Sequence, residues 1–415
     1  MFETEEKKQR ALLVSVDTGE DDAQASMEEL YELTRSADAE PVASMIQKRP
    51  APDGATCVGS GVIKEIAQFC KSHGIDLLIF DCELSPTQIR NIEEDAGVRV
   101  VDRTILILDI FAARARSREG KLQVELAQLQ YLLPRLTGKG TELSRLGGGI
   151  GTRGPGESKL ETDRRHIHRR IESLKAQLTE VEKQRELTKR QRRKSGIQMV
   201  ALVGYTNAGK STLMNRLTEA GVLAEDKLFA TLDPTVRTLK LPSGAKVLLT
   251  DTVGLVRRLP HHLVQAFHST LEQAVEADVI LNICDASSPE AGLHLEVTRE
   301  LLQELGCREQ PVLSVLNKCD RVPDLQGLPV IGSKTLRISA LTGEGIDDLL
   351  AAVEEALPEK MRRITVLLPF SEGGLAAAVR REGTVLEEAY TEDGLRMTAT
   401  VDTRLLVRLG AFIVS

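Results

Sequence analysis

Short apolar runs alternate with amphipathic stretches over the first hundred residues of the chain. The runs have the length and branched aliphatic content of buried strands, and the stretches between them carry apolar residues at helical spacing. The expected strands and helices are, in chain order, residues 11–16, 23–35, 62–72, 77–80, 86–94 and 98–101. This alternation predicts an α/β domain over residues 1–104 with a partly parallel sheet. Gly59-Ser60-Gly61 is interpreted as a plain helix start, because a lone Gly-x-Gly is a weak sign of a phosphate site.

Residues 105–195 contain two helical stretches with apolar residues at coiled-coil spacing. The first is expected to run as one long helix from 105 to about 136, with Pro134 kinking or ending its last turn, and the second begins near Leu160. We expect the two helices to close as an antiparallel hairpin that buries both stripes. The stripes are Leu122, Leu126, Leu129, Leu133 and Leu136, and Ile167, Ile171, Leu174, Leu178 and Val181.

The connection between these helices, residues 138–158, is long and rich in glycine. Six glycines lie between residues 147 and 156, and Arg145 and Arg153 flank or interrupt them. A loop of this length is usually functional or disordered. Bare backbone with nearby cations suits a fit against folded RNA, and a flexible linker is the alternative.

The second helix is strongly basic although the whole chain is acidic. The formal net charge of the chain is −7, whereas residues 160–194 hold 12 Lys and Arg against 6 Asp and Glu. Arg164, Arg165, Arg169 and Arg170 gather near the glycine loop. Phosphate contact explains this local contrast better than a solvated helix face, so we expect the helical arm to touch RNA.

The stretch from Gly204 to Ser211 reads Gly-Tyr-Thr-Asn-Ala-Gly-Lys-Ser, after an apolar strand pattern and before a helical one. Strand, glycine loop, Lys-Ser and helix together predict a phosphate-binding P-loop. Lys210 is expected to reach the β- and γ-phosphates, and Ser211 to ligate Mg²⁺. The expected contacts are Gly204, Tyr205, Thr206, Asn207, Ala208, Gly209, Lys210, Ser211 and Thr212.

Two later segments have the character of nucleotide-dependent switches. In Phe229-Ala230-Thr231-Leu232-Asp233, Thr231 is the first choice and Thr235 the second for giving a hydroxyl to Mg²⁺ and an N–H to the γ-phosphate. In Asp251-Thr252-Val253-Gly254, which follows a strand at 246–250, Asp251 is expected to hold Mg²⁺ through water, and Gly254 to bring an N–H to the γ-phosphate. All residues of both segments are expected to contact the nucleotide. The expected catalytic residues are Lys210, Thr231 and Gly254, and the expected metal ligands are Ser211 and Thr231.

Guanine recognition is predicted from two segments further along the chain. Asn317-Lys318-Cys319-Asp320 follow an apolar strand at 311–316. The two oxygens of Asp320 match the N1–H and N2–H₂ donors that guanine has and adenine lacks. Ser339-Ala340-Leu341 follow a short strand at 336–338, and a backbone N–H there can donate to the guanine O6. In this order after a P-loop, the motifs predict a GTPase.

The position after Gly254, where many GTPases place a water-orienting Gln, is Leu255. An aliphatic side chain cannot orient the attacking water, so we expect slow intrinsic hydrolysis that a partner stimulates. GTPases that lack the Gln resemble this chain in having Asn207, which is expected to help bind K⁺ beside the phosphates. Solvent or partner contact is expected for Arg257, Arg258, His261 and His262.

Composition and length fit a cytoplasmic enzyme of several domains. No run of 18 apolar residues occurs, and the first residues are acidic, which argues against secretion and membrane spanning. The six cysteines show no CxxC pair and are interpreted as reduced thiols without a metal site. The expected domains are an α/β domain (1–104), the helical hairpin (105–195), a P-loop GTPase domain with a mostly parallel sheet and helices on both faces (196–358), and a small α/β domain (359–415).

Several stretches are more specific than the GTPase motifs alone. They are residues 83–86, 102–104, 120–127, 147–157, 160–165, 204–212, 229–234 and 251–254. In these stretches, and over nearly its whole length, the chain resembles the HflX family of ribosome-associated GTPases. The resemblance implies binding to the large ribosomal subunit, a glycine loop near the peptidyl-transferase centre, and splitting or rescue of stalled ribosomes under stress. The family usually has an aromatic or other apolar residue at the position of Leu255. A monomer is expected.

Three other hypotheses come from different classes. One is a GTP-dependent factor for RNA modification or rRNA maturation that shares only the nucleotide domain, and the glycine-tipped arm speaks against it. Another is a nucleotide-sensing module for which turnover is incidental, which the missing Gln favours. A third is ATP-driven RNA remodelling by the N-terminal domain, which no second P-loop supports.

Overall fold

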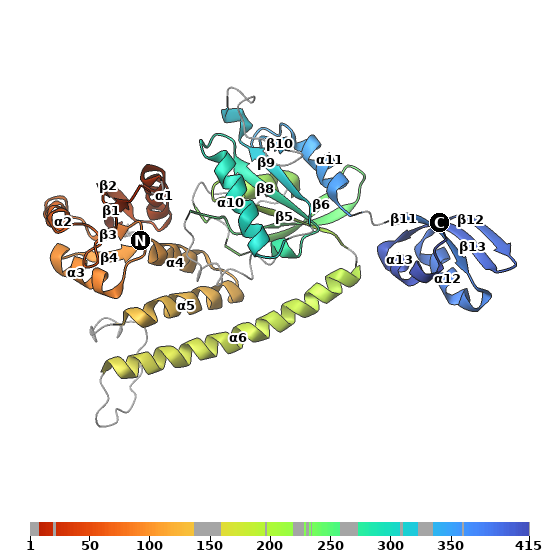
Figure 1. Cartoon of the computed structure of the whole chain (residues 1–415), viewed down its shortest axis with the longest axis horizontal. Helices are drawn as coiled ribbons and strands as arrows, with labels where there is room; N and C mark the ends of the chain where they lie inside the picture. The colour runs from red at the N-terminus through yellow and green to blue at the C-terminus, as the bar shows by residue number, and fades with distance from the viewer. Residues whose placement is uncertain are drawn as a thin grey trace, which may run out of the picture. The chain divides into compact units, whose positions relative to one another are not determined.

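The computed structural model describes residues 8–19, 22–136, 159–195, 197–218, 228–229, 232–233, 235–257, 273–307, 310–322, 335–358 and 361–414. The chain forms two compact units, with the boundary between Glu354 and Glu355. The first unit contains two parallel or mostly parallel sheets and a pair of long helices, and the second contains a small antiparallel sheet (Figure 1). The division of the first unit into three domains stays a prediction.

The N-terminal sheet is parallel throughout, with the strand order β2-β1-β3-β4. Alternate residues of β1 face opposite cores: Leu13 packs with the residues of α1, and Leu12 packs with those of α2 and α3. The predicted α/β domain is confirmed, and Gly59 caps α2 as a plain helix start. The elements are β1 (Arg10–Asp17), α1 (Ala23–Ser36), β2 (Glu40–Lys48), α2 (Ser60–His73), β3 (Leu77–Phe80), α3 (Pro86–Ala96) and β4 (Arg99–Asp102).

Strand β2 is missing from the sequence-based prediction. It is an edge strand, and most of its residues are only half-buried, so its apolar and polar residues show neither a continuous apolar run nor a clean alternation. An edge strand has a neighbouring strand on one side only, so fewer of its residues are buried and its sequence is less uniformly apolar than that of a central strand. Pattern alone therefore could not separate it from a loop.

The single long helix predicted for residues 105–136 is wrong. The chain forms α4 (Arg103–Arg114) and α5 (Arg118–Leu132), separated by an extended residue, Ala115. Ser117 caps the second helix by accepting the N–H of Gly120. A side-chain cap starts a new helix because it satisfies one of the backbone donors that the first turn leaves unpaired. As expected, Pro134 ends the helical run, in a short 3₁₀ turn (Leu133–Arg135).

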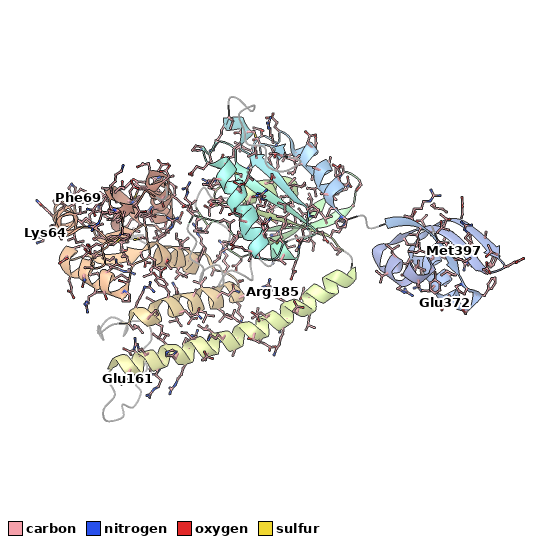
Figure 2. The ribbon with its side chains drawn as sticks, viewed as in Figure 1. Lys64, Phe69, Glu161, Arg185, Glu372 and Met397 are labelled. Atoms are coloured by element: carbon pink, nitrogen blue, oxygen red, sulfur yellow. The ribbon has the colours of Figure 1, made fainter. Side chains whose placement is uncertain are left out.

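Helix α6 (Lys159–Ser195) lies along α5 and closes the predicted antiparallel pair (Figure 1). Ile167, Ile171 and Leu174 are buried as the stripe predicts. Charged contacts also join the helices. Arg170 forms a two-pronged ion pair with Glu125 at 2.6 and 2.7 Å, and Arg185, which is labelled in Figure 2, donates to Glu119 at 2.8 Å. On α5 the buried face is wider than the predicted stripe, because the helix also packs on the N-terminal core. Its buried residues are Leu122, Val124, Ala127 and Tyr131.

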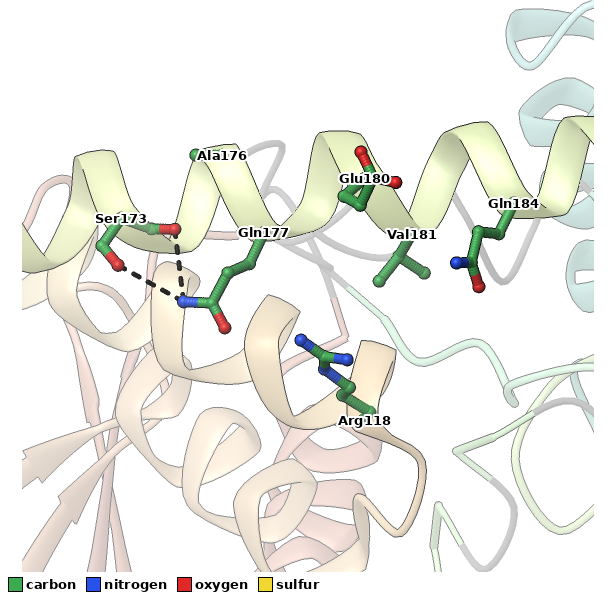
Figure 3. A pocket seen from close by; sticks show the side chains of 7 residues that line it. All are labelled: Arg118, Ser173, Ala176, Gln177, Glu180, Val181 and Gln184. Atoms are coloured by element: carbon green, nitrogen blue, oxygen red, sulfur yellow. Dashed lines mark hydrogen bonds between the residues drawn. The ribbon is translucent and has the colours of Figure 1, made fainter.

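A pocket of about 360 Å³ lies where α6 passes the start of α5 (Figure 3). Arg118 reaches into it from α5, and Gln177 folds back to donate to the hydroxyl and carbonyl oxygens of Ser173. None of the residues expected to bind nucleotide lines this pocket. It is therefore a feature of the hairpin and is distinct from the P-loop site. Its lining is Arg118, Ser173, Ala176, Gln177, Glu180, Val181 and Gln184.

The second sheet of this unit has six strands in the order β10-β9-β8-β5-β7-β6. All neighbours are parallel except β6 and β7, and the central strand β5 has every residue buried. The predicted P-loop fold with a mostly parallel sheet is confirmed. The elements are β5 (Met199–Gly204), α7 (Lys210–Thr218), β6 (Thr235–Lys240), β7 (Lys246–Asp251), β8 (Val279–Asp285), α10 (Ala291–Glu304), β9 (Val312–Asn317), β10 (Thr335–Arg337) and α11 (Ile346–Ala356).

The C-terminal unit is an antiparallel sheet with the strand order β11-β13-β12, packed with two helices. Met397 lies at its centre and is fully buried (Figure 2). The expected α/β unit is present, and strand β12 is an addition: its residues are largely exposed, so it lacks an apolar pattern. The elements are β11 (Met361–Leu368), α12 (Gly373–Glu382), β12 (Thr384–Thr391), β13 (Gly394–Asp402) and α13 (Thr403–Leu409).

Candidate nucleotide-binding site

The glycine loop follows the central strand β5 and leads directly into α7. Gly204 has φ +149°, and a Cβ atom there would lie 2.0 Å from the carbonyl oxygen of Ile283 in β8. Gly209 has φ +89°, and its Cβ would lie 2.2 Å from the side-chain amide of Asn317. Both positions therefore require glycine for conformation and for space. Asn207 also adopts the left-handed conformation, with φ +58°.

Lys210 is buried at the first position of α7. Its ammonium group donates to the carbonyl oxygens of Gly204 at 3.0 Å and Tyr205 at 2.7 Å. Burial lowers the pKa of Lys210 to about 8, and the nearby Asp251 carboxylate acts in the opposite direction. The loop thus holds a cation whose charge is costly until an anion approaches.

The next residue links the helix to the neighbouring strand. The hydroxyl of Ser211 donates to Asp251 Oδ2 at 2.8 Å, and Asp251, the last residue of β7, is fully buried. A hydroxyl and a carboxylate side by side are the hard oxygen ligands that Mg²⁺ prefers. These two residues, predicted separately from two motifs, are brought together because parallel β5 and β7 end at the same edge of the sheet.

Asn317 connects three segments that are far apart in the sequence. Its side-chain N–H₂ donates to the carbonyl of Ala208 at 2.8 Å, and its side-chain oxygen accepts the backbone N–H of Ala340 at 2.9 Å. Only 2% of Asn317 is exposed, so both bonds are shielded from water. One amide therefore fixes the glycine loop relative to both segments expected to read guanine.

The two guanine segments differ in exposure. Asp320 lies in a short 3₁₀ turn (Cys319–Arg321) with its surface exposed, whereas Ser339 is fully buried and Leu341 is 70% exposed. Lys318 adopts φ +63° and pairs with Asp285 at 2.8 Å. Burial alone would raise the pKa of Asp285, but hydrogen bonds from Lys318 and Ser287 outweigh it and lower that pKa.

Asp285 was not among the predicted site residues. It ends β8, the strand beside β9, and a carboxylate at the end of a buried strand is a signal that the sequence offered. Local spacing could not identify Asp285, because it lies 33 positions before its partner Lys318.

The segment after β7 lies directly on the glycine loop. The N–H of Thr206 donates to the carbonyl of Leu255 at 2.8 Å, and the N–H of Leu255 donates to that of Gly204 at 3.1 Å. A Cβ at Gly254 would lie 2.6 Å from the Thr206 methyl group, so glycine permits this close approach. The Thr252 hydroxyl donates to Leu202 at 2.7 Å. The aliphatic side chain of Leu255 is buried in the core.

Only part of the first switch segment is described. Phe229 adopts φ +57° and is buried, and Leu232 and Asp233 follow it. Asp233, one of the expected nucleotide contacts, instead turns its carboxylate toward the start of α5, where it accepts the N–H groups of Arg116 and Ser117 at 2.7 Å each. Ala230 and Thr231, the expected metal ligand, lie outside the described residues, as do Arg258, His261 and His262.

Arg257 does not point to solvent, which corrects the expectation for that residue. Its side chain pairs with Glu290, its N–H donates to Glu29 at 3.2 Å, and its carbonyl accepts from Arg103 at 3.1 Å. Nearby, His294 stacks on the Tyr205 ring at 3.9 Å between centroids. Burial, with the Arg257 cation close by, lowers the pKa of His294 to about 4, so this imidazole is neutral at pH 7.

Four family models match consecutive parts of the chain. They are described as GTP-binding GTPase N-terminal (residues 24–112), GTP-binding GTPase Middle Region (114–192), 50S ribosome-binding GTPase (199–318) and HflX C-terminal domain (331–412). GTPase HflX of Lacrimispora saccharolytica is 48% identical and covers 99% of this chain and 97% of its own length. The chain belongs to the HflX family of GTPases. It binds GTP and GDP and hydrolyses GTP.

A second relative agrees with this membership. GTPase HflX of Escherichia coli is 43% identical and covers 95% of this chain and 93% of its own length. A crystal structure of a GTP-binding protein from Sulfolobus solfataricus in complex with GDP is 26% identical, covers 84% of this chain and 98% of that chain, and has a TM-score of 0.46. Among the residues that the structure describes, no helix is long and apolar enough to cross a bilayer.

The lowered pKa of Lys210 predicts that nucleotide binding is coupled to proton uptake above pH 8. Below about pH 8 the free protein already carries the ammonium form, whereas above it the amine is neutral and must take up a proton when the phosphates bind. Affinity for GDP should fall by up to about tenfold per pH unit above 8. Calorimetry at pH 8.5 in two buffers of different ionisation enthalpy should show more than about half a proton taken up per GDP. Lys210→Met should abolish this uptake, and no uptake by the unmodified protein would contradict the assignment.

Proposed function

We propose that this GTPase binds the large ribosomal subunit and splits or rescues stalled ribosomes, with hydrolysis stimulated by the ribosome. The match of residues 199–318 to a 50S ribosome-binding GTPase model supports this proposal. The observation that carries it is the arm: α6 buries Ile167, Ile171 and Leu174 against α5 while Arg164 and Arg169 stay exposed. A helix that is packed along one face and leaves arginines exposed to solvent suits contact with RNA phosphates.

The glycine loop and Lys210 would hold the phosphates in this proposal. Lys210 would exchange its bonds to the Gly204 and Tyr205 carbonyls for bonds to β- and γ-phosphate oxygens, which are stronger because the acceptor is charged. Water attacks the γ-phosphorus, and the bridging oxygen leaves with GDP as the bond to that phosphorus breaks. Lys210 and the N–H of Gly254 would stabilise the charge that develops, with the remaining contacts from residues 204–212, 229–232 and 251–254.

Ser211 and Thr231 are the proposed ligands of Mg²⁺, with Asp251 holding it through water. The 2.8 Å bond between Ser211 and Asp251 supports this assignment, because it brings two of the proposed oxygen groups together. Bound Mg²⁺ supplies charge neutralisation on the β- and γ-phosphates. Asn207 is the proposed K⁺ ligand, and its left-handed, exposed position on the loop supports that role. Equal GTP turnover in K⁺ and Na⁺ at constant ionic strength would remove the K⁺ proposal.

Intrinsic hydrolysis is proposed to be slow because Leu255 offers no polar group to the attacking water. The structure supports this, since Leu255 is 3% exposed and its backbone is already paired with the glycine loop. Stimulation must then come from groups outside this position.

Guanine specificity is proposed to rest on Asp320, together with Asn317, Lys318, Cys319 and the backbone of Ser339, Ala340 and Leu341. Asp320→Asn replaces an acceptor-only group with one that both donates and accepts. It should weaken GTP binding by at least about tenfold and improve XTP binding, because xanthine offers an acceptor where guanine has its amino group. Competition of both nucleotides against a fluorescent GDP measures this. Unchanged affinities for GTP and XTP would show that Asp320 does not face the base.

We expect the arm to bind the large subunit through its arginine charges, and to split ribosomes through its glycine tip, the loop of residues 147–156. Replacing Arg164, Arg165 and Arg169 by Gln should lower affinity for purified large subunits and reduce the log–log salt slope by at most about one unit per arginine. Arg170→Gln is the matched variant, because Arg170 is committed to Glu125 within the hairpin, and it should leave the slope nearly unchanged. Co-sedimentation across a salt series measures both. Equal slopes for the triple variant and the unmodified protein would exclude phosphate contact by these arginines.

Deletion of residues 147–156, which lie outside the described residues, should separate binding to the large subunit from splitting of ribosomes. It should leave most subunit binding intact and abolish splitting and much of the stimulated turnover, because binding without a productive fit cannot favour the activated state. GTP affinity of the free protein should survive. A deletion variant that splits ribosomes at the normal rate would show that the glycine tip is only a linker.

A further inference from the structure

The carboxylate of Asp233 sits at the N-terminus of α5, at the corner where α4 and α5 meet. One oxygen accepts the backbone N–H groups of Arg116 and Ser117 at 2.7 Å each, and the other accepts the Ser117 hydroxyl. Asp233 lies more than a hundred positions further along the chain, two residues before β6. Three donors from a helix start on one carboxylate make a specific contact, strengthened by the positive end of the helix dipole.

Gly120 explains how the carboxylate can come so close. It is the third residue of α5, and a Cβ atom there would lie 2.6 Å from Asp233 Oδ1 and 3.1 Å from the Ser117 hydroxyl. Glycine is an unfavourable residue within a helix, and its backbone here is ordinary helix. The space that the missing side chain leaves is occupied by Asp233. Gly120 and Asp233 are therefore the two sides of a single contact.

The other end of the same segment is also attached to the N-terminal elements. The N–H of Leu228 donates to the Ser36 hydroxyl of α1 at 3.0 Å. The Phe229 ring meets the Phe111 ring of α4 edge-to-face, with centroids 4.5 Å apart. Leu228, Phe229 and Leu232 are buried in one core with Phe111 and the sheet of the nucleotide domain. Residues 228–229 and 232–233 are thus anchored on α1, α4 and α5.

We propose that Asp233 is a positioning residue for GTP hydrolysis, which fixes the first switch segment against the root of the helical arm. The inference rests on the proposed assignment of that segment as a nucleotide switch. Because these contacts hold residues 228–229 and 232–233, the conformational freedom of these four residues is already restricted, and less must be lost when the segment engages the phosphates in the transition state. Because α5 also packs along α6, a displacement of the arm acts on the nucleotide site through this contact.

Steady-state GTP turnover of the full chain, without ribosomes, tests the proposal. Asp233→Ala should lower kcat by about tenfold and leave KM and GDP affinity within about twofold, because the group acts on the transition state through the segment's position. Asp233→Asn keeps an acceptor oxygen and should restore most of the rate. Gly120→Ala should reproduce the loss from the helix side, although alanine favours the helix itself. Gly61→Ala in α2, where a Cβ meets nothing within 4 Å, is the matched control and should leave kcat unchanged.

The combined variant decides between a specific contact and general damage. If Asp233 and Gly120 act as one contact, the double variant should be no slower than either single variant, within about twofold. Additive losses, a neutral Gly120→Ala, or a raised KM at unchanged kcat would each overturn the proposal. Since no ribosome is present in this assay, a protein that fails to respond to large subunits would refute the proposed function and leave this result standing.

Discussion

Lys210→Met is expected to lower GTP turnover by about 10²–10³-fold, the cost of removing one preorganised donor from a developing charge. The buried ammonium group of Lys210 donates to two carbonyls of the glycine loop, and burial makes its charge costly until phosphates arrive. Methionine is similar in length to lysine and carries no charge, so its side chain can occupy the space of the lysine methylene groups. The loss should therefore come from chemistry and phosphate binding, since the fold does not depend on the ammonium group.

The structure indicates why the Lys210→Met variant should still fold. The Gly204 carbonyl also accepts the Leu255 N–H, and the Tyr205 carbonyl also accepts that of Ala208, so neither is left without a donor. Burial disfavours the ammonium form of Lys210 and lowers its pKa, so removing the charge also removes this desolvation cost. Lys240→Met, at an exposed position on β6, is the control and should leave turnover unchanged. Turnover within about threefold of normal in Lys210→Met would refute the role of Lys210.

Gly204→Ala is expected to destabilise the nucleotide domain by at least about 3 kcal/mol and to abolish GDP binding. The added methyl group would lie 2.0 Å from the Ile283 carbonyl oxygen, which belongs to the backbone of the neighbouring parallel strand. Neither β5 nor β8 can move aside, because both are central strands with a partner on each side. The φ of +149° adds conformational strain for any residue with a Cβ atom.

Hydrogen exchange of the β5 and β8 amides measures the loss of stability in the nucleotide domain, and GDP titration measures the loss of binding. Gly61→Ala is the matched control: it lies in α2 with open space around the new methyl group, so the helix should gain up to about 1 kcal/mol. If Gly204→Ala exchanged and bound GDP like the control, the close contact between these strands would be refuted.

The glycine loop and the switch and guanine motifs could be read from the sequence because their chemistry is local. A P-loop needs glycine, lysine and a hydroxyl at fixed spacing, so Gly204, Gly209, Lys210 and Ser211 were recognisable without a fold. The same holds for the stripe of α6, whose period alone predicts the buried face. Edge strands β2 and β12 lack such a period and escaped prediction.

The break between α4 and α5 shows a different limit. Residues 115–117 (Ala-Arg-Ser) contain neither proline nor glycine, so the sequence favoured one helix, whereas the chain turns there and Asp233 and Ser117 stabilise the new helix start. A carboxylate more than a hundred positions away contributes to that local structure. Sequence spacing carries no information about such a partner.

By itself, the sequence determined the class of fold, the nucleotide chemistry and the basic character of the arm, since each depends on composition or on spacing within one segment. Only the tertiary structure decided that Asn317 ties the glycine loop to Ala340, that Arg257 faces Glu290, and that Asp233 joins the nucleotide domain to α5. These contacts join segments far apart in the chain. Their geometry depends on how the sheets and helices pack, because a hydrogen bond requires two atoms within about 3 Å and the sequence specifies neither position.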